Sequence, residues 1–318
     1  MHDLILRNRV AGYQEGSLTR HVHGEATLPM PAIQRTSLEH HLPHSNVLAV
    51  LPLDAWPHLL AAMRRRRRGA GSWSGKMDRR QRELAKSILA EIAARGPLCS
   101  SDIGDDRRDD QGWGVHASLA KTTLHKLFFH GDVLIARRVG NRRFYDLPER
   151  VLPAETLESA EPSAAETQRW ITLLKLRQRR LVALSPLEVR RVADRVQPLV
   201  VEGCPPLYCL SEDLPLLAGA ETPADMMLLA PLDPLIYDRR VTRQLWGYDY
   251  TWEVYTPPAR RVRGYYALPV LAGVEIVGHI DPKADRAQKK LKVMNRSLRR
   301  GHRVATAVRK LAGFLGCK

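Results

Sequence analysis

Residues 118–147 read S-L-A-K-T-T-L-H-K-L-F-F-H-G-D-V-L-I-A-R-R-V-G-N-R-R-F-Y-D-L, and this stretch decides the predicted fold. Apolar residues recur at helical spacing from Leu119 to Phe128. Ser118 can cap the first turn of this helix, and Gly131 can end it in a left-handed conformation. Two runs of β-branched and aromatic residues follow on either side of Gly140-Asn141, a pattern that predicts a β-hairpin.

The segments upstream complete a recognisable order of elements. Residues 82–95 have the pattern of an amphipathic helix, and residues 100–103 that of a short capped helix. Helix, short helix, helix and hairpin together predict a winged helix-turn-helix. Such a unit places its third helix in a groove of a duplex and its cationic wing on phosphates. The predicted DNA contacts are Lys121 and Lys126 on the helix and Arg137, Arg138, Arg142 and Arg143 on the wing.

The composition favours a polyanionic partner. The 318 residues include 50 Lys and Arg against 34 Asp and Glu, which gives a net charge of +16. A protein this basic usually binds a polyanion. No apolar run approaches the roughly 20 residues needed to span a bilayer, so a membrane is not expected. The N-terminus does not resemble a signal peptide, and we expect a monomer in the cytoplasm, associated with the nucleoid.

Neither a cofactor nor a metal is expected. The four cysteines are scattered without ligand spacing, which favours reduced thiols. His40 and His44 are four residues apart, but His41 stands where a zinc-protease helix would carry its Glu. Pro43 also interrupts the helix that would align the pair.

The fold class expected from these patterns is α+β, with tandem winged helix-turn-helix units followed by a small C-terminal β-barrel. Residues 1–70 are expected to be the remnant of an N-terminal winged-helix domain and 76–150 a winged helix. Residues 164–222 have a weaker helix, helix, hairpin pattern, a second and degenerate winged helix. Residues 226–318 alternate as strands do and end in an amphipathic helix, the predicted barrel. The five arginines at 64–68 are either a solvated helix end or a phosphate anchor.

Cations are concentrated in the C-terminal part. Between Lys283 and Lys310 there are eleven Lys or Arg and one acid, Asp285. The predicted DNA contacts of this part are Arg239, Arg240, Arg260, Arg261, Arg263, Lys283 and Arg286. Together with the wing, these side chains are expected to face the same duplex.

Three long stretches of the C-terminal part resemble one known family. P-L-D-P-L-I-Y-D-R-R at 231–240, Y-T-P-P-A-R-R-V-R-G-Y-Y-A-L-P-V-L at 255–271 and V-G-H-I-D-P-K-A-D-R at 277–286 are similar to blocks of the crosslink-repair DNA glycosylase family of YcaQ and AlkZ. Residues 39–57, 95–103 and 141–153 also look like family blocks, with Glu39 and His44 at matching places. The resemblance implies tandem winged helices, a C-terminal barrel and a monofunctional glycosylase that removes N7-alkylated purines and unhooks interstrand crosslinks from double-stranded DNA.

The sequence departs from the family at its catalytic motif. The family carries Gln-x-Gln or Gln-x-Asp upstream of a block similar to residues 2–13, and here that block begins at His2. Gln34 is followed by Arg35 and Thr36 and does not replace the motif. Either the reading frame starts upstream, or this homologue has lost that half-domain together with the reaction.

Two residues remain as candidate catalytic or lesion-facing groups. Asp281 lies in D-P-K-A-D-R beside Lys283; the alternative is a structural turn with a salt bridge to an arginine. His44 either faces the lesion or is a buried, hydrogen-bonded His. Two further functions stay open: a non-enzymatic winged-helix regulator, which would need a dimer and a palindromic site, and an RNA-binding protein, which would need exposed stacking aromatics.

Overall fold

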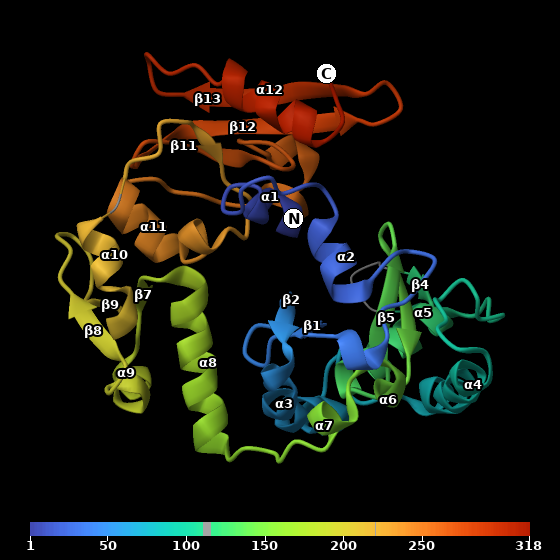
Figure 1. Ribbon diagram of the computed structural model, residues 1–318. Coiled ribbons are helices and arrows are strands. Elements are labelled where there is room, and N and C mark those ends of the chain that lie inside the picture. The colour runs from blue at the N-terminus through green and yellow to red at the C-terminus, as the bar shows by residue number, and fades with distance from the viewer. Residues whose placement is uncertain (111–115, 220) are drawn as a thin grey trace. The chain divides into compact units, whose positions relative to one another are not determined.

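The computed structural model describes residues 1–110, 116–219 and 221–318 (Figure 1). The chain forms two compact units. The α5 unit, named here after its central helix, comprises Leu18–Thr167, and the sheet unit joins Met1–Ser17 to Gln168–Lys318. The predicted segment 1–70 is therefore divided between the two units, and the predicted segments 164–222 and 226–318 lie largely in one. No helix of the described residues is long and apolar enough to cross a bilayer.

The α5 unit is built around one helix and two hairpins. Its two longer hairpins are β1–β2 and β5–β6, both antiparallel. Helices α3 and α4 both contact α5. The main elements are α2 (Ser17–His23), β1 (Ser37–His41), β2 (Leu48–Pro52), α3 (Trp56–Arg68), α4 (Arg79–Arg95), α5 (Leu119–His130), β5 (Leu134–Val139), β6 (Arg142–Asp146), α6 (Pro148–Val151) and α7 (Ala154–Leu157).

The predicted ends of α5 are confirmed. The Ser118 hydroxyl accepts a hydrogen bond from the backbone N–H of Lys121, and Gly131 adopts a left-handed φ of 78°. A Cβ at Gly131 would lie 2.6 Å from the Met63 sulfur of α3, so this side chain would have to move for any other residue. Helix α4 begins with a capping box between Asp78 and Gln81.

The predicted short helix at 100–103 is not formed. Residues 100–103 are a turn in which Asp102 accepts the backbone N–H of Cys99 at 2.8 Å. The prediction was wrong because the Asp that can cap a helix here closes a turn instead. Before this turn, Leu98 pairs with Tyr145 of β6 in an antiparallel bridge. Between Asp102 and α5 the short strands β3 (Arg108–Asp110) and β4 (His116–Ser118) pair with each other.

The first part of the sheet unit follows the predicted helix, helix, hairpin order. Leu176 of α8, Val192 of α9 and Leu210 of β9 pack in one apolar cluster. The three short strands pair in the order β7-β9-β8. The elements are α8 (Ala164–Arg179), β7 (Val182–Ala183), α9 (Pro186–Val192), β8 (Val196–Leu199), β9 (Leu207–Leu210) and α10 (Pro215–Ala218).

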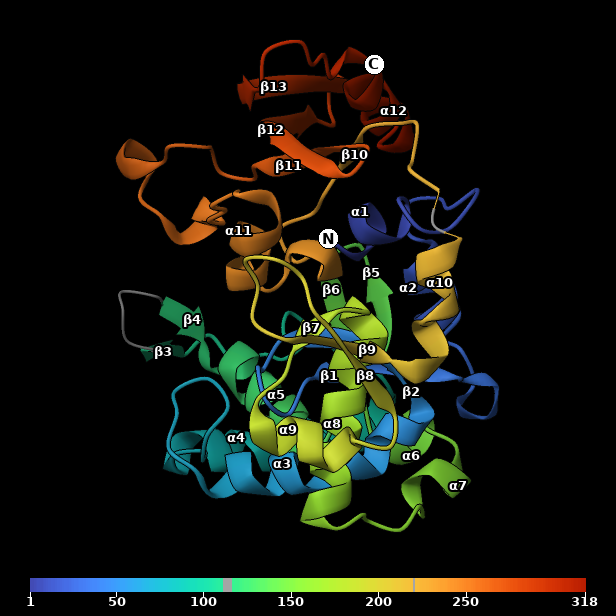
Figure 2. The ribbon, with the colours of Figure 1, turned by 90° about the vertical axis from the view of Figure 1, so that its left-hand side faces the viewer.

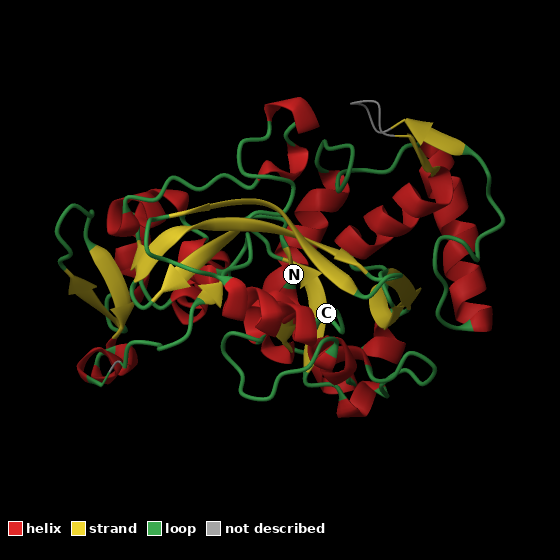
Figure 3. Ribbon diagram, turned by 90° about the horizontal axis from the view of Figure 1, so that it is seen from above, coloured by secondary structure: helices red, strands yellow, loops and turns green. Residues whose placement is uncertain are grey.

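The last part of the chain is an antiparallel four-stranded sheet (Figures 2 and 3). Its order is β10-β11-β12-β13, so among the described residues the first and last strands do not pair and the predicted barrel is not closed. Strand β10 has two residues, too few to pair along the nine of β13. The elements are β10 (Met227–Leu228), α11 (Arg239–Trp246), β11 (Leu268–Ala272), β12 (Glu275–Asp285), β13 (Lys290–Leu298) and α12 (Ala305–Phe314).

The predicted amphipathic helix at the end of the chain, α12, packs on the sheet with part of its apolar face. Leu311 of α12 is buried against the sheet, and Val308 packs at the edge of the same cluster. Phe314 instead contacts the N-terminal segment, which contains α1 (His2–Leu6): its ring stacks with Tyr13, and the Arg7 guanidinium lies over it. The alternating aromatic residues at 251–266 do not form a strand; two short 3-10 turns occupy this segment instead.

Candidate nucleic-acid interface

The wing hairpin β5–β6 carries four arginines with different surroundings. The Arg137 guanidinium lies 3.8 Å from the centroid of the Phe144 ring and donates to the Ala26 carbonyl at 2.8 Å. Arg138 is bound to Glu39. Arg142 at the tip is exposed, and Arg143 is half-buried opposite Arg138 in the strand register. Arg142 and Arg143 are therefore the wing cations best placed to meet phosphates.

Glu39 of β1 is the centre of a buried charge cluster. It accepts hydrogen bonds from Arg138 at 2.5 and 2.8 Å, and its Oε2 lies 3.0 Å from His23 Nε2. Burial alone would raise the pKa of Glu39, but the hydrogen bonds from His23 and Arg138 hold it at about 2. Burial lowers the pKa of His23. Beneath them, the buried Arg35 donates to two backbone carbonyls. Arg138 is thus engaged in the fold, in contrast to its predicted role on DNA.

Helix α5 differs most from its predicted role as the groove-binding helix. Ten of its twelve residues are buried, because α3 and α4 cover it. Lys121 is exposed, as a DNA contact requires. Lys126 is 5% exposed, and its ammonium donates to Gln81 Oε1 at 2.9 Å and to the Lys76 carbonyl at 3.0 Å. Lys126 is therefore a structural group, and its predicted DNA contact is corrected.

The arginine run at 64–68 contains side chains that are paired within the fold and side chains that are exposed at the end of α3. Arg66 is buried, donates to Asn46 Oδ1 at 2.7 Å and lies over the Phe129 ring. Arg67 donates to Asp132 at 2.7 Å and to the His130 carbonyl. Exposed Arg64 pairs with Glu161. The remaining side chains are exposed, and an open depression of about 510 Å³ is lined by Ala61, Arg64, Arg65, Arg68 and Gly69.

An exposed tryptophan next to α5 escaped the sequence reasoning. Trp73, in the loop at 69–76, is 59% exposed. Its ring centroid lies 6.2 Å from that of His125, which is on α5. The sequence does contain a signal for it: Trp73 is a large aromatic residue in a stretch otherwise made of Gly, Ala and Ser. Such a residue has no apolar partner among its sequence neighbours.

In the sheet unit, some of the arginines predicted to contact DNA are engaged in the fold and others are exposed. Arg239 is half-buried over the Tyr250 ring and donates to two backbone carbonyls. Arg261 lies over the Tyr265 ring, and Arg263 donates to the Asp249 carbonyl at 2.5 Å. Arg240 and Arg260 are exposed.

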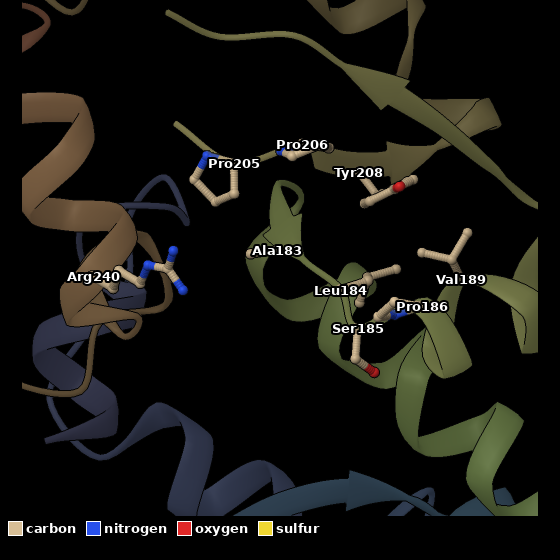
Figure 4. A pocket seen from close by; sticks show the side chains of 9 residues that line it. All are labelled: Ala183, Leu184, Ser185, Pro186, Val189, Pro205, Pro206, Tyr208 and Arg240. Atoms are coloured by element: carbon tan, nitrogen blue, oxygen red, sulfur yellow. The ribbon is translucent and has the colours of Figure 1, made fainter. Parts of the chain in front are cut away.

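Arg240 also borders a hollow of about 600 Å³ in the sheet unit (Figure 4). Its other lining residues are Ala183, Leu184, Ser185, Pro186, Val189, Pro205, Pro206 and Tyr208. In the close-up, the Arg240 guanidinium extends from its helix on one side, with Pro205 and Tyr208 above and Leu184 and Val189 across. Arg240 is the one charged side chain among these lining residues.

Asp281 of β12 has a structural position. It is 7% exposed, and its carboxylate accepts the backbone N–H groups of Tyr265 at 3.0 Å and Tyr266 at 2.9 Å. A Cβ at Gly264 would lie 2.1 Å from the same carboxylate. The role is structural, but Asp281 lies in strand β12 and not in the expected turn, and its partners are backbone amides and not the expected arginine. Lys283 on the same strand is exposed.

The other candidates from the sequence have different surroundings. Arg286 pairs with Glu15 at 2.6 Å. His44 is exposed in the β1–β2 turn, in the other unit. Of the predicted DNA contacts that are exposed, Lys121 and Arg142 belong to the α5 unit, as does half-buried Arg143, and Arg240, Arg260, Lys283 and Arg286 belong to the sheet unit. Among the described residues, no group of three or more His, Cys, Asp or Glu could hold a metal ion.

Comparisons with known proteins identify the family of this chain. Among solved structures, the chain resembles the DNA glycosylase AlkZ of Streptomyces sahachiroi, with a TM-score of 0.52 and 14% identity over 99% of this chain and 85% of that one. At this identity the likeness concerns the fold, which is mixed helix and sheet. A model of the family described as "DNA glycosylase AlkZ-like" matches residues 1–314. The chain belongs to the AlkZ-like DNA glycosylase family.

Proposed function

We propose that the protein binds double-stranded DNA and acts as a DNA N-glycosylase on N7-alkylated purines, including purines tied in interstrand crosslinks. The observation that carries this proposal is the match of the glycosylase family over residues 1–314. The net charge of +16 supports a polyanionic substrate. The protein would work as a monomer on the nucleoid.

The DNA contacts are assigned from exposure. We interpret α4, the Leu98 bridge, α5 and the β5–β6 hairpin as one winged-helix module, and α8 to β9 as a second. Because α5 is covered, the wing is the main contact with the duplex in this proposal, and α5 contributes only the exposed Lys121 in its first turn. The proposed phosphate contacts are six exposed cations and two half-buried ones, Arg143 and Arg261. The exposed six are Lys121, Arg142, Arg240, Arg260, Lys283 and Arg286.

The proposed reaction needs little from the protein at the leaving group. Alkylation at N7 gives the purine a positive charge and makes it a good leaving group, and the sugar then passes through an oxocarbenium-like transition state. A carboxylate or amide near C1′ would stabilise that cation. Asp281 is a poor candidate because its carboxylate already accepts two backbone N–H groups. His44, exposed in its turn, remains the candidate that faces the lesion.

The test is product formation from a defined lesion. A duplex with one N7-methylguanine is incubated with the protein, and abasic sites are detected by alkaline strand cleavage. We expect cleavage at the lesion, a reduced rate for H44A, and no product from the same duplex with unmodified guanine. Absence of abasic product at saturating protein would contradict the proposed glycosylase activity.

A second candidate is DNA binding without catalysis. The observation that favours it is that the buried carboxylates Glu39 and Asp281 are both committed to internal hydrogen bonds. The same incubation separates the two functions if binding is measured in parallel. Tight binding without product supports this second candidate, and the absence of both binding and product at low salt contradicts both.

A further inference from the structure

Trp73 projects from a loop that the α5 unit holds in place. Lys126 donates to the Lys76 carbonyl at 3.0 Å, and His130 Nε2 lies 3.1 Å from the carbonyls of Ser74 and Gly75. Lysine is rarely buried, because desolvating its ammonium costs free energy unless it is well paired. Here two buried polar side chains of α5 are directed at backbone carbonyls of the segment that carries Trp73.

The loop is also closed on itself. The Gly75 N–H donates to the Gly71 carbonyl at 3.1 Å, and the Lys76 N–H donates to the Gly69 carbonyl at 2.8 Å. A Cβ at Gly75 would lie 2.6 Å from the backbone of Gly71, so only glycine permits this approach. These bonds fix the backbone on both sides of Trp73, and its ring is exposed in a defined place.

Two cations lie near the aromatic neighbour of Trp73, His125. Trp73 lies beside His125, and Lys121 is one helical turn before His125 on α5. Burial, Arg143 and Lys121 lower the pKa of His125 to about 4, so its imidazole is neutral at pH 7 and Arg143 and Lys121 lie within electrostatic range. The exposed indole thus lies beside a neutral aromatic ring, and that ring is near one cation of the wing, Arg143, and one cation of α5, Lys121.

From this arrangement we propose that Trp73 is a base-stacking site, which takes an unpaired or unstacked nucleobase while Lys121 and Arg143 contact the flanking phosphates. Aromatic side chains among cations are the usual means of holding bases that have left the duplex stack, because every base has a π-face. The inference rests on the proposed DNA binding and adds to it the part of the nucleic acid that this surface recognises. Lys126 and His130 are positioning residues, because they act through the loop.

The experiment compares intact duplex with the same duplex carrying one bulged 2-aminopurine nucleotide. Affinity is measured by fluorescence anisotropy, and stacking by quenching of the 2-aminopurine emission on binding. For W73A we expect about ten-fold weaker binding to the bulged duplex, loss of the quenching, and less than about a two-fold change for intact duplex. W73F should restore part of both. I33A is the matched control, because Ile33 is a large apolar residue of the same unit that is 78% exposed.

Loop positioning is tested with K126M, and K126R is the conservative variant. We expect K126M to lose the 2-aminopurine quenching while it keeps its affinity for intact duplex, and K126R to retain part of the quenching. Circular dichroism and urea unfolding identify variants that fail to fold, and in that case W73A and W73F alone decide. Equal effects of W73A on both duplexes, or none on either, would overturn the inference.

Two other outcomes separate this inference from the proposed function. If the wild-type protein binds neither duplex, the proposed DNA binding fails and the stacking site fails with it. If it binds intact duplex through Arg142 and Arg143 but W73A quenches 2-aminopurine as wild type does, only the stacking site fails. Sedimentation of wild type and W73A completes the test, because self-association that W73A abolishes would reassign Trp73 to a contact between copies and overturn the inference.

Discussion

Arg138 and Glu39, 99 residues apart in the sequence, form a bidentate ion pair. Arg138 Nε lies 2.8 Å from Glu39 Oε2, and Arg138 Nη2 lies 2.5 Å from Glu39 Oε1. Their side chains are 16% and 5% exposed, so the pair is largely removed from water. An arginine that the sequence assigns to a DNA-binding wing is in fact the link between that wing and the β1–β2 hairpin.

Removal of this link should destabilise the α5 unit. Arg138→Ala leaves the Glu39 carboxylate buried without its main partner, and loss of one member of a buried pair costs about 3–5 kcal/mol. We expect the free energy of unfolding in urea to fall by that order. Arg95→Ala, which removes an exposed arginine paired only with Glu91, should change it by less than about 0.5 kcal/mol. Equal stabilities of the two variants would show that the pair contributes nothing to folding.

The wing tip should act on DNA without regard to sequence. Arg142→Ala combined with Arg143→Ala removes two proposed phosphate contacts, so affinity should drop for every duplex alike. The slope of log affinity against log salt should become shallower by about 0.9 for each phosphate that is no longer neutralised. Binding is measured by anisotropy from about 50 to 200 mM salt, and Arg95→Ala serves again as the control. A weakening confined to one sequence would contradict a phosphate role.

Asp281 should behave as a structural residue. In Asp281→Asn one of the two side-chain acceptors becomes an amide, which cannot accept the N–H of Tyr265 or Tyr266. We expect a loss of about 1–3 kcal/mol in the free energy of unfolding, with any loss of activity recovered at lower temperature. Gly264→Ala should be destabilising as well, because its Cβ would overlap the same carboxylate. Full stability of Asp281→Asn together with abolished product formation would restore its catalytic assignment.

Acid should destabilise the α5 unit through its buried histidines. Burial lowers the pKa of His40 to about 4 and, with neighbouring cationic groups, that of His41 to about 2, against 6.5 for an ordinary His. Below pH 6.5 the unfolded chain binds protons that the folded chain does not, so stability is complete above that pH and declines as the pH falls. Each such group contributes up to about 1.4 kcal/mol per pH unit. We expect urea midpoints to fall from about pH 7 to pH 5.

The control for this pH dependence is His41→Phe. The His41 ring stacks on Phe129 with centroids 3.8 Å apart, and a phenyl ring can keep that contact without titrating. We expect the variant to show a shallower fall of stability between about pH 6.5 and 5. Glu39 also makes the folded state less stable in acid, but at lower pH. Its pKa of about 2 lies below the ordinary 4.5, so its contribution to the free energy of unfolding is lost as the pH drops from about 4.5 to 2. An identical pH profile for wild type and His41→Phe would exclude His41 as a cause.

The sequence by itself determined the elements whose signals are local. The cap at Ser118, the left-handed end at Gly131 and the hairpin turn at Gly140 depend on a few neighbouring residues, and the structure has all three. The family blocks, too, were visible without coordinates. Local steric and hydrogen-bonding preferences act within a few residues, so these features can be predicted from the sequence alone.

Only the tertiary structure decided which charged side chains are available to a partner. Lys126 and Arg138 have the same formal charge as Lys121 and Arg142, yet the first two are bound inside the fold and the last two are exposed. Their partners Gln81 and Glu39 lie 45 and 99 residues away in the sequence, and nothing in the local pattern indicates which distant group will pair with each cation. Burial and pairing of a charge are properties of the packed molecule, because both depend on contacts that form only when separate segments meet.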